Sequence, residues 1–133
     1  MLNYQFNDGG RAISKRPKQK NDCVVRAVAL VLDVPYDTVY DMFARLGRTC
    51  GRGTSKIVWQ SYLDSNNRLK KISFPAQKGI KRMDLNNFHK VYCRGTYIVQ
   101  CAGHLTVVKD GVILDSFVPR VNACVYAVWC KVK

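Results

Sequence analysis

Residues 21–32 read Asn21-Asp22-Cys23-Val24-Val25-Arg26-Ala27-Val28-Ala29-Leu30-Val31-Leu32. The pattern predicts a helix that is apolar around almost its whole surface, and such a helix is normally buried within a larger fold. Asn21 or Asp22 is expected to cap it, because a short side-chain oxygen can accept from the free N–H groups of the first turn. Cys23 then lies at the positive end of the helix dipole, where the pKa of a thiol can fall. The stretch fits an activated thiol and equally a structural cysteine in a core helix.

The length and composition of the chain indicate one folded domain. It has 133 residues, of which 47% are apolar, enough for one core but not for two. No apolar run approaches the ~20 residues that span a bilayer, and the first residues show no secretory signal. We therefore expect a cytoplasmic, monomeric protein whose six cysteines are thiols. The cysteines form no C-x-x-C pair, so neither a metal nor another cofactor is expected.

The chain is strongly basic, with a net charge of +13 from 22 Lys and Arg against 9 acidic residues. Such an excess attracts nucleic acid, anionic surfaces or an acidic protein, although a solvated basic surface without a dedicated partner also fits. Residues 1–20 are expected to form a basic N-terminal arm, and residues 21–133 a single domain. The candidate residues for a nucleic-acid or protein partner lie in the arm and in two later basic runs: Arg11, Lys15, Arg16, Lys18, Lys20, Lys70, Lys71, Lys81 and Arg82.

Beyond the first helix, apolar spacing predicts helices over 38–46, 55–64 and 85–92, with His89 of the last one facing solvent. Alternating patterns predict strands over 69–74, 96–101, 103–109, 112–117 and 123–132. Most helices precede most strands, so the predicted class is α+β, with N-terminal helices packed on a C-terminal antiparallel sheet.

Asp110-Gly111 is the strongest hairpin signal in the chain. A two-residue turn there pairs Lys109 with Val112. Counting back along both strands makes His104 and Asp115 diagonal neighbours on one face of the hairpin, within reach of each other. A register slip by one residue would move them to opposite faces.

Together with Cys23, these residues supply the parts of a nucleophilic site: a thiol, an imidazole base and a carboxylate that orients the base. His104 is expected to accept the thiol proton and later to protonate the leaving group. The oxyanion is expected to be held by the backbone N–H of Cys23 and one side-chain donor. Gln19, four residues before the cysteine, is the first candidate for that donor, and Asn21 is the second.

Three motifs in this order resemble the papain-like cysteine peptidase superfamily: Asn21-Asp22-Cys23 at the start of a buried helix, Gly103-His104-Leu105-Thr106-Val107-Val108, and Leu114-Asp115. The small bacteriocin-leader-type peptidases and uncharacterised phage and bacterial papain-like proteins are the most similar. Asp22-Cys23-Val24-Val25-Arg26-Ala27-Val28-Ala29 with Gly103-His104-Leu105 more weakly resembles ovarian-tumour-type deubiquitinases. The resemblance implies a papain-like fold and a thiol protease. The chain departs from it at Pro17, which stands where papain has its oxyanion glutamine, and at Lys20 and Val24.

Three functions fit these observations. The first is a thiol hydrolase with a catalytic triad that cleaves a peptide, isopeptide or related amide bond of a protein or peptide substrate, inside the bacterial host cell if the chain is phage-encoded. The second is an inactive basic binding module for nucleic acid or an acidic protein partner. The third is a Cys-dependent acyltransferase, since an amine can resolve the same thioester intermediate.

Overall fold

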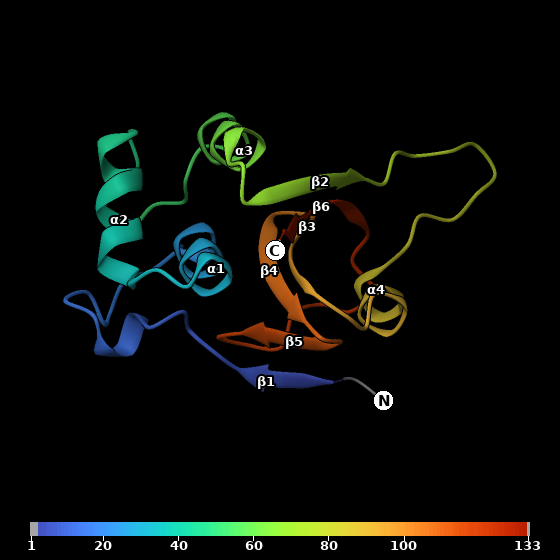
Figure 1. Ribbon diagram of the computed structural model, residues 1–133, viewed down its shortest axis with the longest axis horizontal. Helices are drawn as coiled ribbons and strands as arrows, with labels where there is room; N and C mark the ends of the chain where they lie inside the picture. Colours follow the sequence, from blue (N-terminus) through green and yellow to red (C-terminus); the bar gives the residue numbers. More distant parts are fainter. Residues whose placement is uncertain (1–2, 133) are drawn as a thin grey trace.

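The computed structural model describes residues 3–132 and contains one mixed six-stranded sheet with helices on both faces (Figure 1). The predicted α+β class is confirmed. Three helices cover one face of the sheet and the fourth covers the other: α1 (Cys23–Leu32), α2 (Tyr36–Arg45), α3 (Lys56–Ser65) and α4 (Leu85–Val91). A short 3-10 helix, η1 (Arg11–Ile13), precedes α1.

The strand order across the sheet is β1-β5-β4-β3-β6-β2. Neighbouring strands are antiparallel except β1 and β5, which are parallel, so the purely antiparallel sheet expected from the sequence is wrong at this edge. The strands are β1 (Tyr4–Phe6), β2 (Leu69–Ser73), β3 (Thr96–Cys101), β4 (His104–Lys109), β5 (Val112–Asp115) and β6 (Val125–Lys131).

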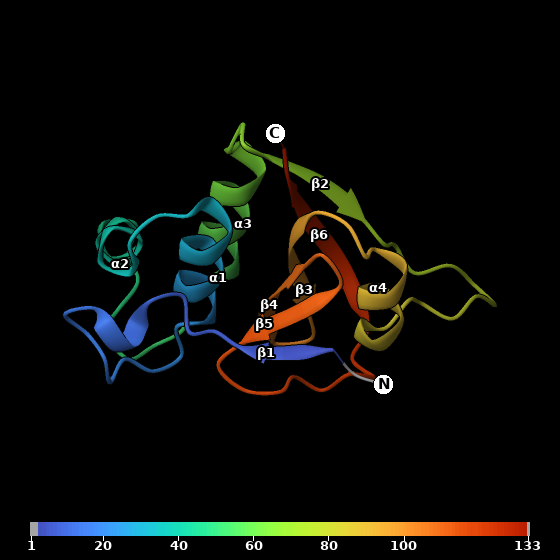
Figure 2. The same ribbon diagram turned by 60° about the horizontal axis from the view of Figure 1, so that its bottom comes forward.

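β1 was not predicted, because three residues are too few to show an alternating pattern. It belongs to the segment expected to form an N-terminal arm, and Figure 2 shows it beside β5 at the edge of the sheet. The chain then passes α1 so closely that a Cβ atom at Gly9 would lie 2.6 Å from the carbonyl oxygen of Arg26. The described part of the arm therefore packs against the sheet and the central helix.

Alternate residues of the strands face two separate cores. Ile98 and Leu105 pack with α1, α2 and α3, whereas Val99 and Val108 pack with α4. His89 of α4 is only 3% exposed, and its Nδ1 lies 3.2 Å from the carbonyl oxygen of Gly111. The prediction that His89 faces solvent was wrong because α4 packs against the turn between β4 and β5, which its own spacing could not reveal.

The central helix α1 is buried, as its sequence predicts, and it packs across β4 with α2 beside it. Its first residue is Cys23, so the fold places this thiol at the point where the helix meets the sheet. Within residues 3–132, no helix has the length and apolar character needed to cross a membrane.

Candidate active site

The turn between β4 and β5 sets the register on which the site depends. Lys109 pairs with Val112, and Asp110 and Gly111 both have positive φ, as a tight two-residue hairpin turn requires. The prediction for this turn is confirmed. In this register Thr106 lies opposite Asp115. His104 lies two residues before Thr106 and therefore on the same face of β4.

The structure brings Cys23, His104 and Asp115 together. His104 Nε2 lies 2.7 Å from Asp115 Oδ2, and the Thr106 hydroxyl donates to the same oxygen at 2.7 Å. The thiol of Cys23 lies close enough to the imidazole and to the backbone of Leu105 for both to lower its pKa. Since Asp115 occupies Nε2, the ring nitrogen left for the thiol is Nδ1. One imidazole thus connects the thiol to the carboxylate.

The surroundings of these groups favour charge separation. Burial alone would raise the pKa of Cys23, but the hydrogen bonds from His104 and Leu105 and the positive charges of His104 and Arg26 outweigh it and lower that pKa. Burial alone would lower the pKa of His104, but its hydrogen bonds to Asp115 and Cys23 raise it to about 9. Burial opposes ionisation of Asp115 too, yet the hydrogen bonds from His104 and Thr106 hold its pKa below the ordinary value. The lowered pKa of Cys23 and the raised pKa of His104 both favour the thiolate–imidazolium pair over the neutral pair.

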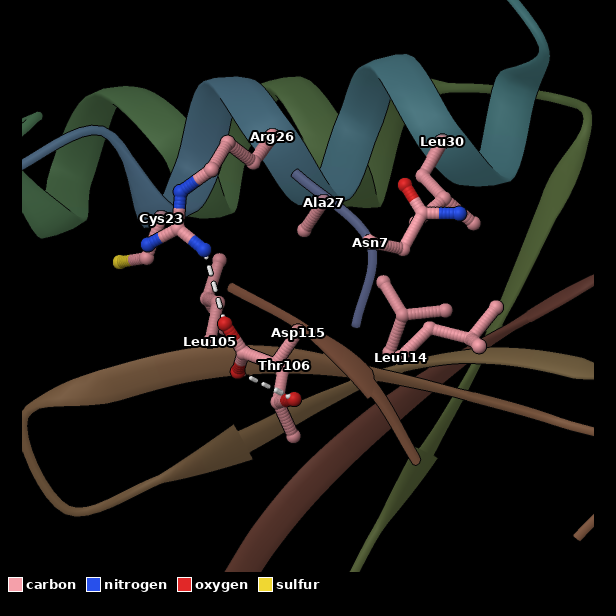
Figure 3. Close-up of a pocket in the computed structure, with 10 residues that line it drawn as sticks. Asn7, Cys23, Arg26, Ala27, Leu30, Leu105, Thr106, Leu114 and Asp115 are labelled. Carbon is pink, nitrogen blue, oxygen red and sulfur yellow. Dashed lines mark hydrogen bonds and ion pairs between the residues drawn. The ribbon is translucent and has the colours of Figure 1, made fainter. Parts of the chain in front are cut away.

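Sequence reasoning assigned Arg26 no role at this site. It lies one turn after Cys23, and Figure 3 shows it reaching from α1 to Asp115, where its Nη1 donates to Oδ1 at 2.8 Å. Its Nε donates to Asp22 Oδ1 at 3.0 Å. A single arginine in an otherwise apolar helix was the signal that could have found it, because a buried charge needs partners.

Asp22 occupies the N-cap position of α1, but its side chain makes no capping hydrogen bond. It accepts instead from Arg11 at 3.0 Å, from Arg26 and from the hydroxyl of Tyr36 at 2.7 Å. The prediction that the Asp22 side chain caps this helix was therefore wrong. The first intrahelical bond is that from Arg26 N to Asp22 O, so no backbone carbonyl of the helix takes the N–H of Cys23, which suits an oxyanion there.

The two candidate oxyanion donors both face the loop after α2. Gln19 Oε1 accepts from the N–H of Gly51 at 2.7 Å, and its Nε2 contacts Cys50 Sγ at 3.5 Å. Asn21, which has a left-handed backbone with a φ of 53°, donates through Nδ2 to the Gly51 carbonyl at 2.9 Å. Gln19 and Asn21 still line the hollow beside Cys23, but in this conformation their amide groups hold the loop.

Two hollows flank the thiol, and Cys23, Gly53, Gly103 and His104 line both of them. The first, the Trp59 hollow, has a volume of about 410 Å³. Its other described lining residues include no acidic side chain: Val24, Thr54, Lys56, Trp59, Gln100, Cys101, Leu105 and Tyr126. The second, the Lys20 hollow, has a volume of about 500 Å³, and its remaining described lining is Arg11, Gln19, Lys20, Asn21, Asp22, Arg26, Ser116 and Phe117.

Two residues beside the thiol were assigned no role at the site by sequence reasoning. Thr54 lines the Trp59 hollow, and its buried Oγ1 has no hydrogen-bond partner among residues 3–132. Phe117 lines the Lys20 hollow, with its ring centroid 5.0 Å from that of His104. Phe117 falls at the end of the strand predicted over 112–117, but β5 ends at Asp115, and no pattern assigns a role at the site to Thr54.

The candidate polyanion residues do not form one continuous surface. Residues 11–20 lie at one end of the molecule, and Lys81 and Arg82, in the loop after β2, lie at the other (Figures 1 and 2). Several of these charges are already paired: Arg11 with Asp22, Arg16 with Asp37 and Asp41, and Lys71 with Asp64. Four of the remaining candidates are exposed: Lys15, Lys18, Lys20 and, in β2, Lys70.

Within residues 3–132, no three His, Cys or acidic side chains lie close enough together to hold a metal ion. Comparison of the chain with protein-family models, with curated proteins and with solved structures gives no match. The geometry around Cys23 is therefore the observation on which a function rests.

Proposed function

We propose that the protein is a papain-like thiol hydrolase that cleaves a peptide, isopeptide or related amide bond with Cys23, His104 and Asp115. One observation carries the proposal: His104 is hydrogen-bonded to the Asp115 carboxylate and lies beside the Cys23 thiol, with which it lines the same two hollows. The arrangement of a nucleophile helix packed on a sheet that carries the base supports the papain-like assignment.

The chemistry follows from this pair. His104 holds the thiol proton, and Cys23 Sγ attacks the carbonyl carbon of the substrate. The N–H of Cys23 stabilises the resulting oxyanion. His104 then gives its proton to the amine nitrogen as the C–N bond breaks, which leaves a thioester on Cys23. Water attacks the thioester, His104 accepts a proton from the water, and the acid product leaves with the thiol regenerated.

The position of the thiol between two hollows favours an extended substrate. A chain that crosses Cys23 passes Gly53 and Gly103, where a Cβ atom would meet nothing within 4 Å, so both glycines leave room. The Trp59 hollow presents aromatic and aliphatic side chains to one half of such a chain. Asp22 is the one acidic residue among the described residues that line the Lys20 hollow. It is only 1% exposed, and its charge is neutralised by Arg11 and Arg26. We expect an apolar side chain in the first hollow and an acidic one in the second.

The test is labelling with a peptide-like electrophile that mimics an amide, followed by mass-spectrometric mapping of the six cysteines. Wild-type protein should be labelled at Cys23, His104→Ala should lose most of that labelling, and Cys50→Ala should retain it as the matched control. A label that maps to Cys50, or that forms at Cys23 equally fast without His104, would contradict the proposal.

The products then distinguish hydrolysis from acyl transfer. Peptide libraries incubated with the wild-type protein should yield new carboxyl ends that are absent with Cys23→Ala. Addition of a primary amine should leave acid as the main product, because water resolves the thioester in a hydrolase. Amide product in excess over acid would instead identify an acyltransferase.

A further inference from the structure

We infer that Arg26 is a positioning residue of this site: Arg26 holds Asp115 against His104 and limits how strongly His104 retains its proton. The inference rests on the proposed function. Arg26 lines the Lys20 hollow, but its hydrogen bonds go to Asp115 and Asp22 and none goes to the thiol. It acts through Asp115, and it joins the helix that carries Cys23 to the strand that carries the carboxylate.

The hydrogen bonds of Asp115 leave little freedom for its carboxylate. Oδ2 accepts from His104 and Thr106, and Oδ1 accepts from Arg26 at 2.8 Å and from the backbone N–H of Ser116 at 2.7 Å. A carboxylate has about four acceptor positions, so all are used. Without Arg26, Oδ1 would keep only the neighbouring backbone N–H.

Arg26 is itself fixed from the other side. Its Nε donates to Asp22, whose carboxylate also accepts from Arg11 of η1 and from Tyr36 of α2. Asp22, Arg26 and Asp115 are all buried, with exposed fractions of 1%, 8% and 3%. One arginine is therefore shared between two buried carboxylates, one of which belongs to the proposed triad.

The shared charge bears on both reacting groups in the same direction. A positive guanidinium disfavours a proton on His104 and favours the thiolate of Cys23, so it lowers both pKa values. The charged or titratable groups that face this cluster come from every element packed around it: Tyr4 of β1, Arg11 of η1, Asp22 before α1, Cys23 and Arg26 of α1, Tyr36 of α2, Cys101 of β3, His104 of β4 and Asp115 of β5. Within the described chain, two of these groups form an ion pair with Asp115: Arg26 and His104.

The experiment uses the full chain with Cys50→Ala, so that the exposed Cys50 does not contribute. The rate of Cys23 alkylation by iodoacetamide is measured against pH, and the titration of His104 is followed by NMR. Arg26→Gln should move both midpoints upward by about one unit, the usual effect of losing one close charge. Arg26→Lys, which keeps the charge, should restore most of the shift. Arg16→Gln, which removes an arginine paired with Asp37 and Asp41, is the matched control and should move neither midpoint.

Asp22→Asn provides a second variant that retains Arg26. Removal of that negative charge leaves Arg26 to Asp115 alone, so both midpoints should move downward, opposite to Arg26→Gln. Folded variants of Arg26 and Asp22 with wild-type profiles would show that Arg26 has only a structural role. If Arg26→Gln does not fold, a pH profile of Asp22→Asn that matches the wild-type profile would likewise show that Arg26 has only a structural role. If the wild-type thiol titrates like a free cysteine, the proposed function itself fails, and that outcome is distinct.

Discussion

Asp115→Asn is the substitution that tests the proposed triad most directly. The pKa of His104 is about 9 against an ordinary value of 6.5, a difference of about 2.5 units that is worth about 3 kcal/mol at 1.36 kcal/mol per unit. The His104 side chain is 18% exposed, so little of this is screened by solvent. An asparagine keeps the shape and a hydrogen bond but removes the charge. We expect the pKa of His104 to fall by about 2 units, and Cys23 at pH 7.5 to lose its imidazolium partner in most molecules.

The sign of the stability change follows from the same shift. The raised pKa of His104 stabilises the fold fully below 6.5, and this contribution is lost as the pH rises through about 9. The lowered pKa of Asp115 stabilises the fold above its ordinary 3.8 and is lost as the pH falls through the folded value. Asp115→Asn should therefore destabilise the protein most between about pH 4 and 6.5, and the difference from wild type should shrink toward pH 9.

The assay is an NMR titration of the His104 ring, with urea unfolding at several pH values. Asp84→Asn is the matched control, because Asp84 caps α4 by accepting from the N–H of Asn87 and lies on the other side of the sheet. A wild-type His104 that titrates near 6.5, or a value near 9 that survives in Asp115→Asn, would refute the reasoning.

Three further predictions follow from particular contacts. Cys23 should alkylate faster than Cys50 at pH 6, although Cys50 is more exposed and its own pKa is lowered by hydrogen bonds from Tyr40 and Gln19. His104→Ala should slow the alkylation of Cys23 alone, and equal rates for the two thiols in the wild-type protein would exclude an activated Cys23. Gly9→Ala should lower the free energy of unfolding by about 1–3 kcal/mol, measured in urea. Gly79→Ala, at a similar φ of 78° but with no atom within 4 Å, should cost less, and equal losses would mean that the contact with Arg26 yields easily. Charge reversal at Lys15 and Lys18 and at Lys81 and Arg82 should weaken binding of a short DNA duplex additively, because the pairs lie at opposite ends of the molecule; strong coupling in fluorescence anisotropy would contradict this.

The parts of the site that the sequence predicts correctly are those encoded locally. The apolar run after Cys23 predicts a buried helix because no polar face interrupts it, and Asp110-Gly111 predicts the turn because both positions need positive φ. Once the turn is known, the two-residue period of a strand places His104 and Asp115 on one face without further information.

The parts that the sequence could not predict depend on contacts between distant residues. Asp22 is a good capping residue by type, but its carboxylate instead accepts hydrogen bonds from Arg11, Arg26 and Tyr36. The amide of Gln19 is engaged by the loop around Gly51, whose N–H donates to Gln19 Oε1 at 2.7 Å. Neither outcome is visible from the spacing of residues along the chain.

The edge strand β1 has a consequence for how the site comes together during folding. The Tyr4 hydroxyl and the Asn7 N–H both donate to the carbonyl oxygen of Asp115 at 2.9 Å, and Tyr4 lies 111 positions from Asp115 in the chain. Closing so long a loop is entropically costly, so this pairing is expected late in folding and early in unfolding. A local opening that releases β1 would loosen the backbone of Asp115 while α1 stays packed. Such a form would retain most of its helices and strands yet hold His104 less firmly, so the reactivity of the thiol would disappear at lower denaturant concentrations than the helical circular dichroism signal.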